Sequence, residues 1–123
     1  MKALTLLIIL LFPMAAQAAD DAASWTTMDT VLQLTFTAVT VVDWAQTLRI
    51  ARGHDDYVER NSLLGDHPSE GRVNSYFAAG IVAHAAVSYA LPKPWRTMWQ
   101  CFWIGGEVKT VSYNINAGLR LSF

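Results

Sequence analysis

Charge and cysteine are both scarce in this chain. Charged residues make up 15% of it and hydrophobic residues 53%, whereas charged residues reach roughly 25% in soluble domains. A small soluble domain cannot hide so much apolar surface, so contact with lipid is expected. The single cysteine, Cys101, excludes an internal disulfide, and its place in an apolar run predicts an inert, buried thiol.

A basic excess and catalytic motifs are also missing. Nine Lys and Arg residues oppose ten Asp and Glu residues, which excludes the strongly basic surface that nucleic-acid binding requires. The sequence has no P-loop, CxxC, HExxH or nucleophile-elbow pattern. We therefore expect a protein that is not an enzyme, uses no cofactor and binds no nucleic acid.

The first 18 residues have the pattern of a secretory signal peptide. Met1 and Lys2 make a basic start, an apolar run follows over 3–12, and Ala16–Ala18 is a small-residue cleavage site. The apolar run is too short to cross a bilayer comfortably. We expect cleavage after Ala18, which leaves 19–123 as a single membrane domain of the bacterial cell envelope.

Three apolar segments follow, at 28–52, 73–92 and 95–117, and each is long enough to predict a membrane-spanning helix. Thr26 and Asp29 suit the start of the first segment as capping residues. The run Pro92–Pro94 predicts a turn between the second and the third. The predicted fold class is an all-α, three-helix transmembrane bundle.

The distribution of basic residues predicts how this bundle is oriented. With the mature N-terminus in the periplasm, the cytoplasmic side carries five arginines: Arg49, Arg52, Arg60, Arg72 and Arg120. Only Lys93 and Arg96 fall on the periplasmic side, in agreement with the positive-inside rule. The predicted location is the bacterial inner membrane.

The end of the chain supports an alternative. From Val111 to Phe123, apolar and polar residues alternate without a break, as in the closing strand of an outer-membrane β-barrel. A small β-barrel-like protein of the outer membrane therefore stays open as an alternative.

Ionisable and amide side chains within the predicted spans form a candidate intramembrane polar seam. Its members are Asp43, Gln46, Thr47, His84, Glu107 and Asn114. In one interpretation, Asp43 pairs with Lys109 or joins a hydrogen-bonded seam that holds the helices together. In the other, Asp43, His84 and Glu107 meet and handle protons or cations.

The polar connection between the first two segments is predicted to be a structured loop. Its key residues are Glu59, Asn61, Gly65, Pro68 and Ser69, with Gly65 in an unusual backbone conformation and Pro68–Ser69 at the start of the second helix. His54, Asp55, Asp56, Glu59, Asp66 and His67 are metal-ligand types, but their spacing matches no known site, and no metal is predicted.

Two strings in this region carry a resemblance to a family. Asp43-x-x-Gln46-Thr47 and Glu59-x-Asn61-x-Leu63-Leu64-Gly65-x-x-Pro68-Ser69 resemble motifs of uncharacterised small membrane proteins of proteobacteria and their phages, with Ser62 in place of the usual Pro. Glu107 and Asn114 fit the later helical Glu and Asn of that family more loosely. The resemblance covers 43–69 and implies a membrane location but no activity.

Together these patterns predict a small, non-catalytic accessory or interaction protein of the membrane. Its expected partners are the lipid bilayer and either another membrane protein or a second copy of itself. The loop and the Trp-rich third helix are the expected docking surfaces.

Overall fold

The computed structural model describes residues 24–53 and 57–119. Within these ranges the chain forms three α-helices and no strand: α2 (Thr27–Ala51), α3 (Glu70–Ala90) and α4 (Trp95–Asn116). The prediction of an all-helical, three-helix fold is therefore confirmed for this part of the chain. The predicted signal peptide, Met1–Ala18, lies outside the described residues. No helix among those described combines the length and the apolar character that crossing a membrane requires.

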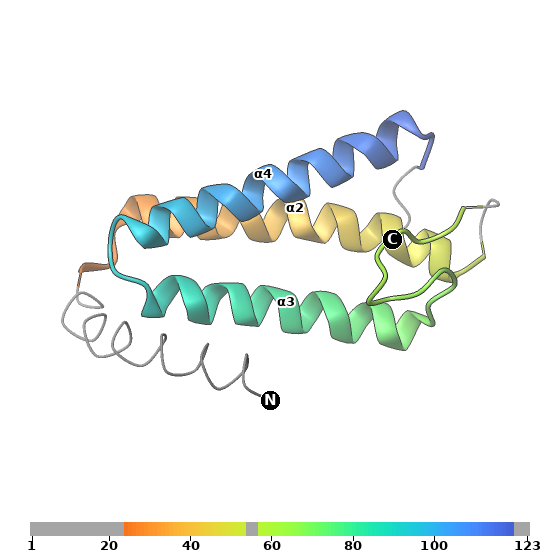
Figure 1. Cartoon of the computed structure of the whole chain (residues 1–123), viewed down its shortest axis with the longest axis horizontal. Coiled ribbons are helices and arrows are strands. Elements are labelled where there is room, and N and C mark those ends of the chain that lie inside the picture. The colour runs from red at the N-terminus through yellow and green to blue at the C-terminus, as the bar shows by residue number, and fades with distance from the viewer. Residues whose placement is uncertain (1–23, 54–56, 120–123) are drawn as a thin grey trace, which may run out of the picture.

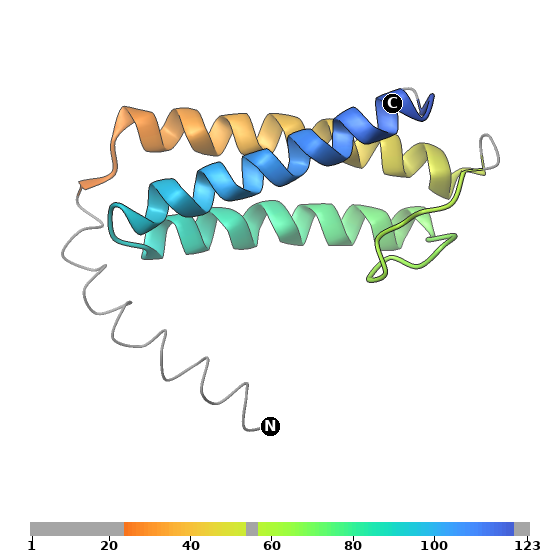
Figure 2. The ribbon, with the colours of Figure 1, turned by 45° about the horizontal axis from the view of Figure 1, so that its top comes forward.

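The three helices form an up-down-up bundle, in which α2 and α4 point in the same direction and α3 in the opposite one (Figure 1). In Figure 2, α4 begins beside the end of α3 and finishes beside the second half of α2. Residues 57–69 lie at one end of the bundle, and the short turn at 91–94 lies at the other. This arrangement lets all three helices contribute side chains to one interior.

Local capping explains where the helices begin. Thr26 and Asp29 form a reciprocal capping box at the start of α2, in which each side chain bonds to the backbone N–H of the other residue. The Ser69 hydroxyl accepts a hydrogen bond from the backbone N–H of Arg72 at 3.2 Å. Because Ser69 is the cap, α3 begins at Glu70, as predicted from Pro68–Ser69 and three residues before the predicted apolar segment.

The alternation of apolar and polar residues from Val111 does not produce a strand over the described part of it. Residues 111–116 continue α4, and the Ala117 backbone N–H still bonds to the carbonyl of Tyr113. On a helix, residues that alternate between apolar and polar are spread around the axis. The alternation therefore does not create separate apolar and polar faces here, as it would in a strand. Residues 120–123, also part of that pattern, lie outside the described residues.

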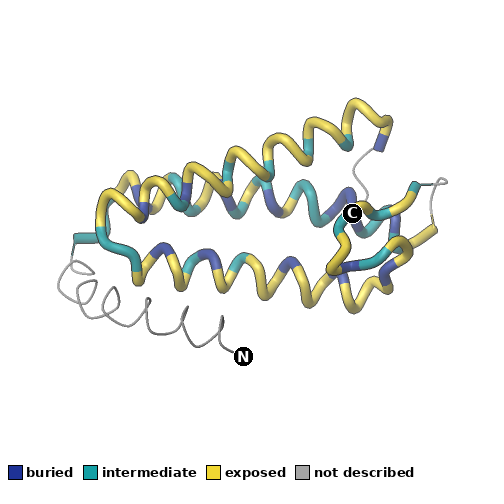
Figure 3. Tube along the Cα trace, in the orientation of Figure 1, coloured by how far each residue is buried: buried dark blue, intermediate teal, exposed yellow. Residues whose placement is uncertain are grey.

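The interior of the bundle is unusually polar, and its surface is unusually apolar. Among residues 24–53 and 57–119, seven buried residues are hydrophobic, while eight are polar or charged: Asp29, Thr40, Gln46, Thr47, His84, Ser88, Arg96 and Gln100. Figure 3 shows the buried positions along the inner faces of the helices and exposed positions over most of the outside. The prediction of a buried Cys101 is wrong, because its side chain lies on the exposed face of α4.

A compact apolar cluster is found only at the loop end of the described bundle. Leu64, Val73 and Phe77 are buried together there. Trp44 stacks on Phe77 with ring centroids 5.9 Å apart and donates a hydrogen bond to Asn74 at 2.8 Å. This cluster attaches the loop to α2 and α3 by burial of apolar surface.

Candidate functional site: a polar seam inside the bundle

Asn114 of α4 joins two polar side chains of α2. Its side-chain amide donates to the Asp43 carboxylate at 3.1 Å and to the Gln46 amide oxygen at 2.9 Å. Gln46 is fully buried, and Thr47 beside it is buried too. The pairing of Asp43 with Lys109 is not formed, since Lys109 is exposed and neither described ion pair includes these residues.

Glu107 lies in the same α2–α4 interface, about two turns before Asn114 on α4 and opposite the middle of α2. Four hydrogen bonds link α2 to α4, and the residues they join differ by 67 to 71 in number. The same offset places Glu107 beside the turn from Phe36 to Thr40. The buried Oε2 atom of Glu107 has no hydrogen-bond partner among the described residues, and neither does the buried hydroxyl of Thr40.

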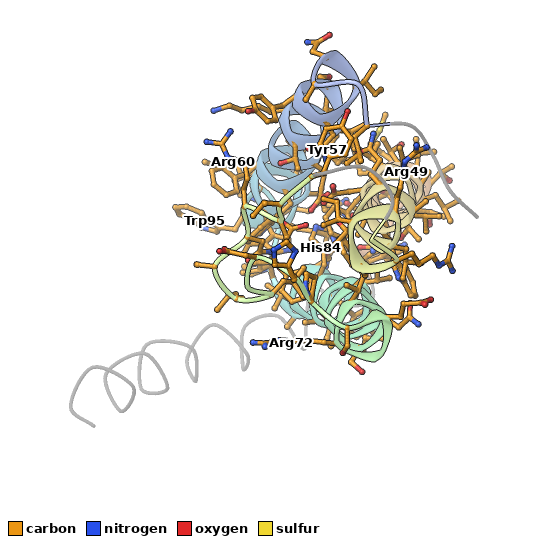
Figure 4. All side chains as sticks on the ribbon, turned by 90° about the vertical axis from the view of Figure 1, so that its right-hand side faces the viewer. Arg49, Tyr57, Arg60, Arg72, His84 and Trp95 are labelled. Carbon is orange, nitrogen blue, oxygen red and sulfur yellow. The ribbon has the colours of Figure 1, made fainter. Side chains whose placement is uncertain are left out.

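The structure does not bring His84 to the carboxyl group of Asp43. His84 Nδ1 lies 3.0 Å from the amide oxygen of Gln33, and its ring stacks on Phe36 with centroids 3.6 Å apart. Trp99 also stacks with the His84 ring, with centroids 5.7 Å apart. Viewed from the loop end, His84 lies between the three helices (Figure 4). Since Gln33 precedes Asp43 by ten residues on α2, His84 lies in a different layer of the interior from Asp43.

A second polar centre, which the sequence did not predict, lies at the turn end of the bundle. Arg96 is fully buried, donates to the Asp29 carboxylate at 3.2 Å and donates to the carbonyl of Ser88 at 2.8 Å. Gln100, one turn later on α4, donates to the backbone carbonyl of Asp29 at 3.0 Å. The sequence placed Arg96 on the periplasmic side of the membrane but did not predict that its guanidinium pairs inside the bundle.

One sequence signal could have found this centre. Arg96 and Gln100 are four residues apart, so they share a helix face. A charged residue and an amide on one face of an apolar helix indicate a buried polar contact as readily as a surface position. Its partner, Asp29, could not be identified from the sequence, because the contact spans 67 residues.

The loop at the other end of the bundle is held by its own hydrogen bonds. The Asn61 carbonyl accepts from the N–H groups of Leu64 and Gly65, and its side-chain oxygen accepts from Leu63. Gly65 has a φ of +80°, which agrees with the unusual conformation expected of it. Glu59 bonds to the Asn61 N–H at 2.7 Å, and Pro68 is buried.

Contacts to the helices hold this loop over the bundle. The Asn61 side-chain amide donates to the Tyr76 hydroxyl of α3 at 2.8 Å. Arg60 bonds to the hydroxyl of Tyr113 and lies over its ring, 5.0 Å from the centroid. The Tyr57 hydroxyl donates to the Ala117 carbonyl at 2.9 Å. The loop is therefore an ordered surface held against the helices.

Metal ligation has little support in the described part of the chain. Among residues 24–53 and 57–119, no three His, Cys, Asp or Glu side chains gather closely enough to hold a metal ion. His54, Asp55 and Asp56 lie outside the described residues.

Comparison of the chain with protein-family models, with curated proteins and with solved structures found no match. The resemblance to the small membrane proteins of proteobacteria stays a prediction.

Proposed function

We propose that this chain is a small, non-catalytic integral membrane protein of the bacterial envelope that acts as an accessory or interaction subunit. In this proposal α2, α3 and α4 lie in lipid as one bundle, after export and removal of residues 1–18. The loop at 57–69 is the surface offered to another membrane protein or to a second copy of the chain.

The observation that carries this proposal is that polar side chains lie in the interior of the bundle while large apolar side chains lie on its surface. Large apolar side chains such as Leu34, Val82 and Phe102 are 63%, 68% and 72% exposed, while Arg96 and Gln100 are fully buried. In water, this distribution leaves apolar surface exposed and ionised groups desolvated. In lipid, the same outward side chains are solvated, and interior polar groups are the contacts that hold helices together.

Several of the most deeply buried side chains of α3 and α4 are polar. In α4 the only buried residues are Arg96 and Gln100, and in α3 the buried set includes His84 and Ser88. The helices have 25, 21 and 22 residues, which corresponds to about 31–38 Å and matches a hydrocarbon core of about 30 Å.

The burial of Arg96 also strengthens the proposed orientation. With Arg96 paired to Asp29 inside the bundle, Lys93 is the remaining basic residue of the 91–94 turn. The opposite end carries Arg52, Arg60 and Arg72, all exposed. This asymmetry favours a cytoplasmic loop and a periplasmic turn.

The native cysteine provides a direct test, because Cys101 is exposed on α4. In intact membranes a lipid-facing thiol cannot ionise and reacts slowly with maleimide, since the thiolate is the reactive form. A variant that carries Cys101→Ala and Ser62→Cys places the only thiol on the exposed loop, where it should react at once. Rapid labelling of native Cys101 in membranes, equal to that of the loop thiol, would contradict the proposal.

Fractionation and crosslinking complete this test. Inner- and outer-membrane fractions separated by density should show the chain in the inner membrane, and recovery in the outer-membrane fraction would contradict that location. A crosslinkable residue in place of Leu63, which is 67% exposed on the loop, should capture one defined partner. The same residue at Val82, on the outward face of α3, is the matched control and should crosslink only to lipid.

A further inference from the structure

Seven buried polar side-chain atoms in the described bundle have no hydrogen-bond partner, and they come from Thr40, Gln46, His84, Arg96, Trp99, Gln100 and Glu107. Native structures contain only a few such atoms, and each calls for an explanation such as a bound water or ion. Two of them, the Thr40 hydroxyl and Glu107 Oε2, belong to the same level of the α2–α4 interface. They point to a ligand that neither helix supplies.

Thr40 differs from three other threonines of the helices, Thr35, Thr37 and Thr110. The hydroxyls of Thr35, Thr37 and Thr110 each bond to the backbone carbonyl four residues earlier, at 2.8–3.1 Å. The Thr40 side chain is 3% exposed, and its hydroxyl makes no such bond. A buried hydroxyl without a partner costs free energy, so this oxygen is available to a ligand in the interior.

Asp43 completes the cluster. It follows Thr40 by three residues, hence lies on the same face of α2 about one turn later. The carboxylates of Glu107 and Glu59 are close enough to Asp43 to interact with it electrostatically. Neither Asp43 nor Glu107 takes part in an ion pair with a described cationic side chain.

The groups around this cluster leave its negative charge uncompensated. From α4 come Glu107 and the neutral amide of Asn114, and from the loop comes Glu59. The buried residues of α3 are Val73, Phe77, His84 and Ser88. His84 is the titratable one: it contacts Gln33 and stacks on Phe36, about one turn of α2 before Thr40. Two carboxyl groups in a poorly hydrated interior are stable together only when they share a cation.

We propose that Thr40, Asp43 and Glu107 form a binding site for one small cation, either a proton or Na⁺, between α2 and α4. Carboxylate and hydroxyl oxygens suit both ions, because both are hard cations that oxygen ligands stabilise. The Asn114 amide orients Asp43 and is a positioning residue. Buried carboxyl groups on bundle-facing helix surfaces typically mark ion or proton sites in membranes. The site rests on the proposed membrane location but does not depend on the accessory role.

Carbodiimide labelling of the purified full-length chain tests the site. Dicyclohexylcarbodiimide is an apolar reagent that modifies protonated carboxyl groups shielded from water, and peptide mass spectrometry locates the adduct. In Na⁺-free buffer we expect an adduct at Glu107 or Asp43 that forms more slowly as the pH rises. The exposed carboxylate of Glu70 is the internal control and should stay unlabelled.

Two arms of the experiment distinguish the ions. If NaCl slows labelling at constant pH and choline chloride does not, the site binds Na⁺; if only pH changes the rate, the site binds a proton. Labelling that is absent from both carboxyl groups at every pH would overturn the proposal. Labelling that is insensitive to both pH and Na⁺ would overturn it as well.

A pair of threonine variants separates a ligand from a structural residue. Thr40→Val removes the unpartnered hydroxyl and should change the labelling rate or the protecting Na⁺ concentration by about tenfold, the value of one hydrogen bond to a charged group. Thr37→Val, on the same helix, removes a hydroxyl that bonds to the backbone and should change neither. Equal behaviour of both variants and the native chain would exclude Thr40 as a ligand. Labelling of the native chain needs no variant, so the test stands even if Thr40→Val fails to fold.

Discussion

Arg96 and Asp29, which lie 67 residues apart in the chain, form an ion pair at 3.2 Å inside the bundle. The two side chains are 0% and 2% exposed. Arg96 also bonds to the Ser88 carbonyl at 2.8 Å and lies over the ring of Trp25, 5.0 Å from the centroid. One guanidinium thus joins the start of α2, the end of α3 and the start of α4.

Removal of either partner of this pair should destabilise the bundle. Arg96→Met leaves the Asp29 carboxylate without its cation, and we expect a loss of about 3 kcal/mol in the free energy of unfolding, since an uncompensated buried charge is left behind. Guanidinium titration in mild detergent, followed by circular dichroism, measures it. Adding Asp29→Asn to Arg96→Met should restore part of the loss.

The exposed ion pair provides the matched control for this prediction. Arg52 and Glu70 lie 3.1 Å apart with side chains 30% and 52% exposed. Glu70→Gln should change stability by less than about 1 kcal/mol, because solvent screens exposed pairs. Equal effects of Glu70→Gln and Arg96→Met would show that the buried pair has no special role in stability.

Asn114 should matter far more than the asparagine two residues later. Asn114→Ala leaves the Asp43 carboxylate and the Gln46 amide oxygen without their shared donor. We expect a loss of about 1–3 kcal/mol, the cost of unpaired buried polar groups. Asn116 is exposed at the end of α4, and Asn116→Ala should have almost no effect. Thermal melting measures the stability of both variants, and similar melting temperatures for the two would contradict the prediction.

The two glycines Gly65 and Gly80 should respond to alanine in opposite directions. Gly65 has a φ of +80°, which costs an L-residue about 1–2 kcal/mol, so Gly65→Ala should destabilise the loop. Gly80 lies within α3 with no atom near the position of an added Cβ, and Gly80→Ala should stabilise the helix by about 0.5–1 kcal/mol. Hydrogen exchange of the 57–69 amides should increase in the first variant only.

Ser62→Pro is expected to stabilise the chain. Asn61 and Leu64 are the first and last residues of a turn closed by a 2.9 Å backbone hydrogen bond, which puts Ser62 at its second position, where proline is favoured. Proline there reduces the freedom of the unfolded chain and should add about 0.4–1 kcal/mol. The free energy of unfolding of Ser62→Pro is compared with that of Ser75→Pro, which lies within α3. Proline inside a helix should be strongly destabilising. A loss of stability in Ser62→Pro would contradict this turn geometry.

The amino-acid sequence by itself determined the three helices and the main features of the loop. Thr26 and Ser69 cap helices through bonds to residues three positions away, and Pro92 and Pro94 interrupt the chain between α3 and α4. These interactions are local, and local patterns can therefore be recognised without knowledge of the fold. The conformation of Gly65 was recognised in the same way.

Only the tertiary structure decided which polar residues meet. Arg96 found Asp29, Asn114 found Asp43 and Gln46, and His84 joined Gln33 in place of the predicted carboxyl groups. Each of these contacts depends on the register and rotation of one helix against another, which arise from packing between residues far apart in the chain. A helix face can be derived from a spacing of three or four residues, but its partner depends on how the faces pack in three dimensions.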